Sequence, residues 1–315
     1  MSDLFTMSAL SVLLVSFGVG IVVGLTGMGG GALMTPALIF LGVNPTAAVS
    51  NDLVSAAVSR PVGAAVHWRG GTPNVKLAMW LVLGSVPTAF AGAFIIQALG
   101  PSGTQEKFVE LAIGGALILT SITYTLKMYL QLRNVTSANR KPRADAEVKP
   151  LVTFAVGAVG GLLVGITSVG SGSLIMVALL LLYPALSAVS LVGTDLLQAV
   201  PLVISAAVSH VIVDGVQWAV LIPLVVGSTP GTFLGARLAS WVSQSVIRRG
   251  IVIVLALTGL KMLGVPATAV LIIGAALLII GPVVWGFLRQ SRGLPAFENL
   301  PDPLGNNHSD PPHRD

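Results

Sequence analysis

Two glycine- and serine-rich stretches interrupt long apolar runs of this chain, and their residue types suit the binding of a small anion. Residues 24–31 read GLTGMGGG and residues 165–173 read GITSVGSGS. Glycine in a helix interior costs up to about 1 kcal/mol relative to alanine, so we expect a helix break at each stretch. A half-helix that begins at a break directs unpaired N–H groups and a partial positive charge towards its surroundings. We interpret the two breaks as walls of one site, with contacts from Thr26, Gly27, Gly29, Gly30, Gly31, Ser168, Gly170, Ser171, Gly172 and Ser173. The alternative is that the glycines only let helices pack closely.

Asp52 and Asp195 each lie in a predicted membrane helix that carries several other polar residues. An ionisable group at mid-membrane costs at least about 2.5 kcal/mol, so each aspartate needs a reason to be there. One reason is proton coupling, because a protonated aspartate lets an anion approach without placing two like charges together. The other is that each aspartate caps or complements the N-terminus of its helix.

Other polar residues accompany these aspartates. Asn51, Thr194 and Gln198 are further candidate substrate contacts, and Arg60 is the candidate counter-charge for a bound anion. Arg60 has no counterpart in the second half and instead pairs with an acid or snorkels in the competing interpretation. His67 and His210 are either helix-end anchors or protonation sites at a gate.

The composition defines the elements that hold these residues. Of 315 residues, 54% are hydrophobic and only 9% are charged, whereas a soluble domain carries about 25% charged residues. We predict an all-α integral membrane protein, and we expect the first apolar run to remain in the mature chain because no positive segment precedes it. The net charge of +5 is scattered over predicted loop ends, which argues against a nucleic-acid partner. The absence of cysteine excludes disulfides and thiolate chemistry.

The chain contains an internal duplication. An offset of 143 residues relates Asp52 to Asp195 and His67 to His210, and an offset of 141 relates Gly24 to Gly165. We predict two repeats, each a Gly-broken or re-entrant helix hairpin plus transmembrane helices, with about 8–10 membrane segments in total. The expected divisions are repeat 1 (1–130), a cytoplasmic linker (131–149), repeat 2 (150–288) and a disordered cytoplasmic tail (289–315), and 67–73 is expected to be a loop.

Basic residues predict that the repeats are inverted. With the 131–149 linker in the cytoplasm, Arg237, Arg248 and Arg249 also lie inside, and the Asp214–Gly215 loop lies outside. The first break then enters from outside and the second from the cytoplasm. If the broken segments cross the membrane rather than turn back, this assignment weakens.

At these positions the sequence resembles the TauE/SafE family over about residues 15–265. The resemblance is carried by GLTGMGGG with Asn51-Asp52 and Gly84-Ser85, and by the Gly165 stretch with Thr194-Asp195 and Gly227-Ser228. It implies a secondary permease for sulfite, sulfoacetate and related organosulfur anions, usually an exporter of the bacterial inner membrane. The second break departs from the first in being rich in serine.

Together these observations favour a secondary transporter of small sulfur-containing oxyanions, coupled to the proton gradient, with the lipid bilayer and protons as its other partners. An anion channel of the same architecture is the alternative. A membrane-embedded enzyme is less favoured, because no Gly-x-Ser-x-Gly, His-Glu-x-x-His or nucleotide-binding loop is present. We expect no cofactor and no metal, and the last helix, 267–288, is a candidate lipid-facing or homo-oligomer surface.

Overall fold

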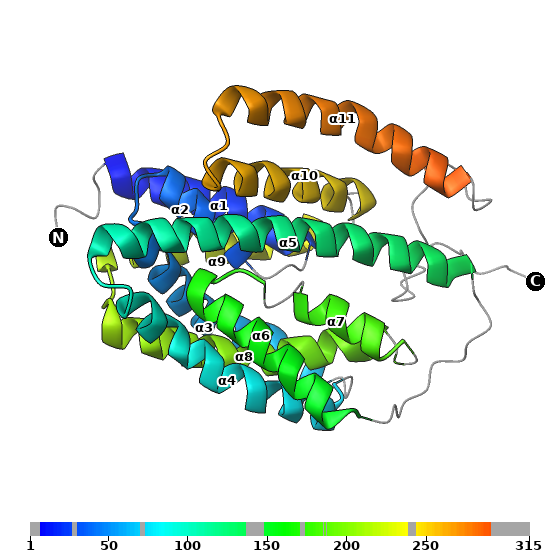
Figure 1. Ribbon diagram of the computed structural model, residues 1–315, viewed down its shortest axis with the longest axis horizontal. Helices are drawn as coiled ribbons and strands as arrows, with labels where there is room; N and C mark the ends of the chain where they lie inside the picture. Colours follow the sequence, from blue (N-terminus) through cyan, green and yellow to red (C-terminus); the bar gives the residue numbers. More distant parts are fainter. Residues whose placement is uncertain are drawn as a thin grey trace, which may run out of the picture.

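The computed structural model describes residues 7–26, 30–69, 73–136, 148–170, 174–184, 186, 188–238 and 244–290. Within these ranges the ordered elements are all helices, arranged side by side in one bundle (Figure 1). They are α1 (Met7–Thr26), α2 (Gly31–Phe40), α3 (Pro45–Arg69), α4 (Val75–Gln97), α5 (Ser102–Thr136), α6 (Pro150–Thr167), α7 (Leu174–Leu182), α8 (Ala188–Val213), α9 (Trp218–Leu238), α10 (Gln244–Met262) and α11 (Ala267–Gln290).

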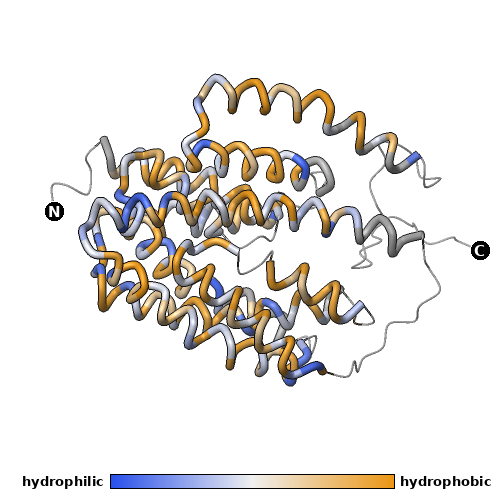
Figure 2. Tube along the Cα trace, in the orientation of Figure 1, coloured by the Kyte–Doolittle hydropathy of each residue, from blue (hydrophilic) through white to orange (hydrophobic). Residues whose placement is uncertain are grey.

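Six helices of the described chain are long and apolar enough to cross a bilayer: α1, α4, α5, α6, α8 and α9. Apolar residues run along most of the bundle, and polar residues concentrate towards the loops (Figure 2). The short helices α2 and α7, of 10 and 9 residues, each follow one of the glycine-rich breaks. The predicted all-helical membrane architecture is therefore confirmed.

Two helix pairs, α1 with α9 and α4 with α6, make the most extensive contacts in the bundle. A Cβ added to Gly24 of α1 would lie 2.1 Å from the carbonyl oxygen of Thr232 in α9. A Cβ added to Gly165 of α6 would lie 2.4 Å from the carbonyl oxygen of Ala89 in α4. Gly165 follows Gly24 by 141 residues and Thr232 follows Ala89 by 143, so one contact occurs twice. Close packing is thus what Gly24 and Gly165 provide, as the alternative interpretation held for such glycines.

Two pairs of equivalent helices, α3 with α8 and α5 with α10, run in opposite directions. At one end of the α3–α8 pair, Ser50 donates to the carbonyl oxygen of Gly215 at 3.0 Å, just beyond the end of α8. At the other end, the Asn74 amide, just beyond α3, donates to the hydroxyl oxygen of Thr194 near the start of α8 at 2.9 Å. In the α5–α10 pair, Ser121 donates to the carbonyl oxygen of Val252 at 3.0 Å. Gly114, earlier on α5, packs against Gly259, later on α10, so this pair is also antiparallel.

Three expected boundaries differ from the structure. Residues 67–69 end α3 and are helical, although 67–73 was expected to be a loop. Helix α5 continues to Thr136, six residues into the expected 131–149 linker, because nothing between 131 and 136 breaks a helix. Helix α11 ends at Gln290, and the remainder of the expected tail lies outside the described residues, as does 137–147.

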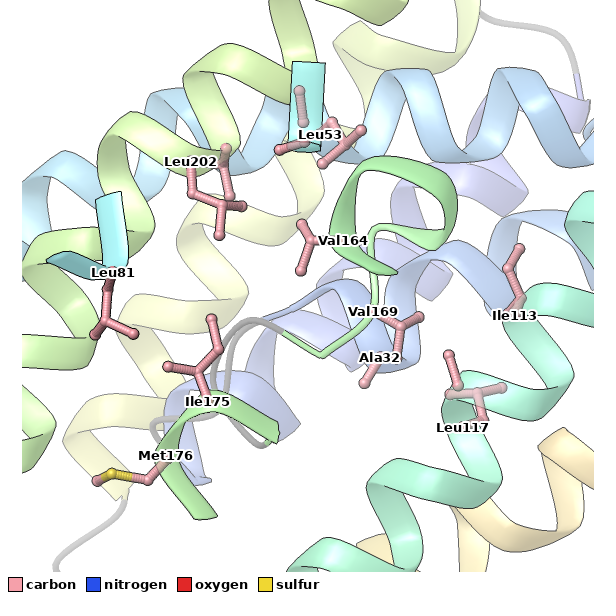
Figure 3. Packing of buried hydrophobic residues seen from close by; sticks show 14 of the residues in the cluster. Ala32, Leu53, Leu81, Ile113, Leu117, Val164, Val169, Ile175, Met176 and Leu202 are labelled. Atoms are coloured by element: carbon pink, nitrogen blue, oxygen red, sulfur yellow. The ribbon is translucent and has the colours of Figure 1, made fainter. Parts of the chain in front are cut away.

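The apolar core surrounds the two breaks. Ala32 of α2 and Val169 of the second break lie side by side, with Val164 of α6 nearby (Figure 3). Ile113 and Leu117 of α5 complete this part of the cluster. The core thus joins segments of both halves at one place.

Candidate functional site

The two glycine-rich breaks touch each other in the middle of the bundle. Gly31 is the first residue of α2, and a Cβ built on it would lie 2.0 Å from the carbonyl oxygen of Ser168. A Cβ at this position would clash with the Ser168 backbone, so only glycine fits without movement of the chain. The two stretches predicted to form one site are therefore in direct contact through Gly31 and Ser168.

The second break has a defined backbone. Helix α6 ends with Ser168 in the left-handed conformation (φ 58°), which is uncommon for a residue other than glycine. The amide of Val169 bonds to the side-chain oxygen of Thr167 at 3.1 Å, so the backbone leaves the helix there. Gly170 (φ 111°) follows, and its carbonyl oxygen accepts the amide of Leu174 at the start of α7.

Asp52 connects three segments at this contact. Its Oδ2 accepts hydrogen bonds from Thr35 Oγ1 of α2 at 2.6 Å and from Ser168 Oγ of the second break at 2.7 Å. The residue is buried, with 4% of its surface exposed. Asp52 does not cap its helix, because α3 begins at Pro45 and Asn44 Oδ1 accepts the amide of Thr46 there. The capping interpretation therefore does not apply to Asp52.

Asp195 has a different environment from its repeat counterpart. Its Oδ1 accepts a hydrogen bond from Gln198 Nε2 on the same helix at 3.1 Å. The position equivalent to Thr35 in the second half, at an offset of 141, is Met176, which offers no hydroxyl. The two aspartates are thus related by the repeat but not by their partners.

Arg60 carries the positive charge of the site. It lies on α3, is partly exposed, and interacts electrostatically with both Asp195 and Asp52. A guanidinium presents several donors in a planar fork, which matches the oxygens of a carboxylate or a sulfonate. Arg60 is therefore placed to balance the charge of the two aspartates or of an incoming anion.

Two buried amide side chains offer acceptor oxygens. Asn51 donates from Nδ2 to the carbonyl oxygen of Ala47 at 2.7 Å, and Gln198 donates to Asp195. Within the described chain, Asn51 Oδ1 and Gln198 Oε1 have no hydrogen-bond partner. A buried acceptor left without a donor costs about 1–3 kcal/mol, so both oxygens are suited to accept from a bound group.

The remaining predicted contacts are distributed unevenly. The Thr26 hydroxyl donates to Val22 of its own helix at 2.7 Å. The Gly30 carbonyl oxygen accepts the amides of the first turn of α2. The Thr194 hydroxyl donates to Ser190 and accepts from Asn74, so it links α8 to the start of α4. The others, Gly27, Gly29, Ser171, Gly172 and Ser173, lie outside the described residues.

Thr35 is the site residue that the sequence did not single out. It is fully buried in α2 and supplies the shorter of the two hydrogen bonds to Asp52. Its position in the sequence, a hydroxyl residue one helical turn after the first glycine break, could have identified it as a candidate contact. In the described part of the chain, no group of three or more histidine, aspartate or glutamate side chains is arranged to hold a metal ion.

A helical membrane protein whose two broken segments meet at a buried carboxylate has the architecture of a membrane transporter. Comparison with known families agrees with this class. The family model described as sulfite exporter TauE/SafE matches residues 12–262, and the chain belongs to this family. The resemblance seen in the sequence is confirmed, and the protein is a multi-pass membrane transporter.

Relatives with similar sequences carry compatible names. The chain is 35% identical over 257 residues to the probable membrane transporter protein YjnA of Bacillus subtilis (strain 168), covering 81% of this chain and 100% of that one. It is 25% identical over 257 residues to the probable membrane transporter protein YdhB of the same strain, covering 80% and 99% of the two chains. No solved structure matches the chain.

Proposed function

We propose that the chain moves small sulfur-containing oxyanions, such as sulfite or organosulfonates, across the membrane as a secondary transporter coupled to protons. The description of its family as sulfite exporters supports this substrate class. The observation that carries the proposal is the contact of the two breaks at Asp52, through Ser168 and Gly31. A substrate that separates or joins the breaks would change the hydrogen bonds of a buried carboxylate.

Charge gives Asp52 a role in coupling. The two carboxylates are balanced by Arg60 and by Lys127, which acts on Asp195, so an anion that enters alone leaves one negative charge unbalanced. Protonation of Asp52 or Asp195 removes one negative charge and frees Arg60 to face the substrate. Binding of a proton therefore favours binding of an anion, because the proton removes a negative charge that would repel the anion.

The opposite directions of equivalent helices support an inverted repeat. In this proposal each break is reached from one side of the membrane, and alternating access exposes the site to each side in turn. The exposed apolar side chains of α11 face lipid or a second copy of the chain.

An anion channel would use the same lining without coupling, and an enzyme would need a nucleophile with its base. Flux in proteoliposomes separates these functions. Purified protein is reconstituted, and uptake of labelled sulfite and of sulfoacetate is measured with and without a pH gradient. Saturable uptake against the substrate gradient, driven by the pH gradient, is expected. Uptake that follows only the substrate gradient would indicate a channel, and no uptake of either anion would refute the proposed substrate class.

The Asp52→Asn variant tests the coupling role. Asparagine keeps an oxygen that accepts from Thr35 and Ser168 but cannot bind a proton as a carboxylate does. We expect the pH gradient to lose its effect on flux while substrate exchange persists. Glu110→Gln, a carboxylate of α5 outside these contacts, is the control. Gradient-driven flux equal to the control would remove Asp52 from this role.

A further inference from the structure

A buried histidine on α8 meets the end of α6, close to the second break. His210 Nε2 lies 2.7 Å from the carbonyl oxygen of Gly165, and His210 Nδ1 lies 2.9 Å from Asp214 Oδ2. The imidazole is fully buried, whereas the Asp214 side chain, in the loop after α8, reaches solvent. His210 therefore links the last turn of α6 to the surface of the protein.

Both neighbours of the ring are hydrogen-bond acceptors. A backbone carbonyl has no proton to donate, and an aspartate carboxylate carries none near neutral pH. A neutral imidazole has one N–H and can satisfy one of these acceptors. The doubly protonated imidazolium satisfies both, so the two distances together fit the cation.

The Gly165 carbonyl needs this donor because α6 ends there. In a continued helix the amide of Val169 would bond to the Gly165 oxygen. Instead that amide bonds to Thr167 Oγ1, which leaves the Gly165 carbonyl to a partner from another helix. A cation beside the last carbonyls of a helix is also favoured by the helix dipole. His210 thus closes the C-terminal end of α6.

We propose that His210 is a proton-binding site of this transporter, whose imidazolium form holds the C-terminal turn of α6 closed at the second break. On deprotonation His210 loses its Nε2 proton, which passes to water. The remaining proton stays on Nδ1, because a hydrogen bond to a carboxylate is stronger than one to a neutral carbonyl. The Nε2 lone pair then faces the Gly165 oxygen, and this contact is lost. The end of α6 is held at low pH and released as pH rises.

Charged groups on the neighbouring helices define the field at His210. Helix α8 packs against α3, α4, α6 and α7, and the sequences of α6 and α7 contain no ionisable side chain. On α4, Lys76 lies at the end of the helix that meets the start of α8, the opposite end from His210. The described side chains of α3 include Asp52 and Arg60, and α8 carries Asp195 near its start. Ser50 reaches the residue after Asp214, so Asp52 is, besides Asp214 itself, the carboxylate at the His210 end of α8.

This inference rests on the proposed function because it adds a second proton site to the same break. Asp52 holds Ser168, and His210 holds Gly165, three residues earlier on the same turn. A proton at His210 and a change of charge at Asp52 therefore act on one backbone segment from two sides. His67 occupies the equivalent position in the first half, and its side chain lies outside the described part.

The protonation state can be measured without substrate. The chain has four histidines, and a variant with His67, His308 and His313 replaced by Asn leaves His210 alone. Nitrogen-15 NMR of this variant in lipid bilayers distinguishes the imidazolium from each neutral tautomer. As the pH of the sample is raised we expect conversion from the imidazolium to the Nδ1–H tautomer. One neutral tautomer throughout, or conversion to the Nε2–H tautomer, would overturn the proposal.

Release of α6 is measured by cysteine labelling, because the natural chain has no cysteine. Val169→Cys places a thiol at a fully buried position beside the break. The maleimide labelling rate is compared with that of the same variant carrying His210→Gln, whose amide donates to Gly165 without titrating. The ratio of the two rates cancels the ionisation of the thiol. Below its midpoint the ratio should rise about tenfold per pH unit, the slope of one titrating group.

A ratio that does not change with pH would refute the coupling of His210 to the break. Asp214→Asn serves as a second variant, which keeps His210 in place and removes the charge that stabilises its imidazolium. In that variant the rise in labelling should move to lower pH, and an unchanged midpoint would also contradict the proposal. Neither NMR nor labelling depends on sulfite, so failure here is distinct from failure of the flux experiment.

Discussion

The Gly31→Ala variant tests whether contact between the two breaks holds the site together. The new Cβ would lie 2.0 Å from the Ser168 carbonyl oxygen, whereas ordinary contact begins at about 3.4 Å. The breaks would have to separate by about 1.4 Å, and the neighbouring atoms are backbone, which cannot rotate away. Overpacking of this kind costs about 1–3 kcal/mol. The hydrogen bond from Ser168 Oγ to Asp52, 2.7 Å long, would be stretched by the same movement.

The adjacent glycine is a matched control. A Cβ on Gly30 would meet only Val23 Cγ2 at 3.9 Å, and φ there is −59°, so Gly30→Ala should change stability by less than about 1 kcal/mol. Thermal unfolding of both variants in the same detergent and flux in proteoliposomes give the comparison. We expect a lower unfolding temperature and reduced flux for Gly31→Ala alone. Equal behaviour of the two variants would show that the breaks do not need this contact.

The other predictions concern hydrogen bonds and helix packing. Thr35→Val removes a donor to a buried carboxylate and should cost about 1.5–3 kcal/mol, measured by thermal unfolding. The control is Ser209→Ala, which removes only a bond within its own helix, and an equal loss in both variants would argue against a special role for Thr35. Gly20→Ala should weaken the α1–α9 contact, because its Cβ would lie 2.6 Å from a backbone oxygen, whereas Gly18→Ala meets nothing within 4 Å. If Gly18→Ala proves as harmful as Gly20→Ala, helix packing is not the reason for the loss.

The sequence predicted the features that depend on local chemistry. Clustered glycines disfavour a helix, and the ends of α1 and α6 lie within two residues of their predicted positions at the two breaks. The all-helical structure of the described residues and the apolar length of the helices follow from composition in the same way. The end of α3 was missed because residues 67–69 favour neither state strongly.

The partners of the site residues could not be read from the sequence. Asp52 and Ser168 are 116 residues apart, and their hydrogen bond depends on how the two halves pack. The same holds for Gly165 and His210, which are 45 residues apart. The repeat predicted that Asp52 and Asp195 are equivalent, but Met176 occupies the position that matches Thr35, so their partners differ. The internal repeat therefore predicted the positions of the helices better than it predicted the hydrogen-bond partners of the two aspartates.

The exchange of partners between halves has a consequence for biosynthesis. Helix α1 packs along α9, whose Thr232 is translated about 200 residues after Gly24. The face of α1 that carries Gly20 and Gly24 therefore lies in the membrane without its final partner until α9 has been inserted. Neither half contains the helix that its own first segment packs against. Separately expressed halves should be unstable alone and should assemble when they are produced together in one cell.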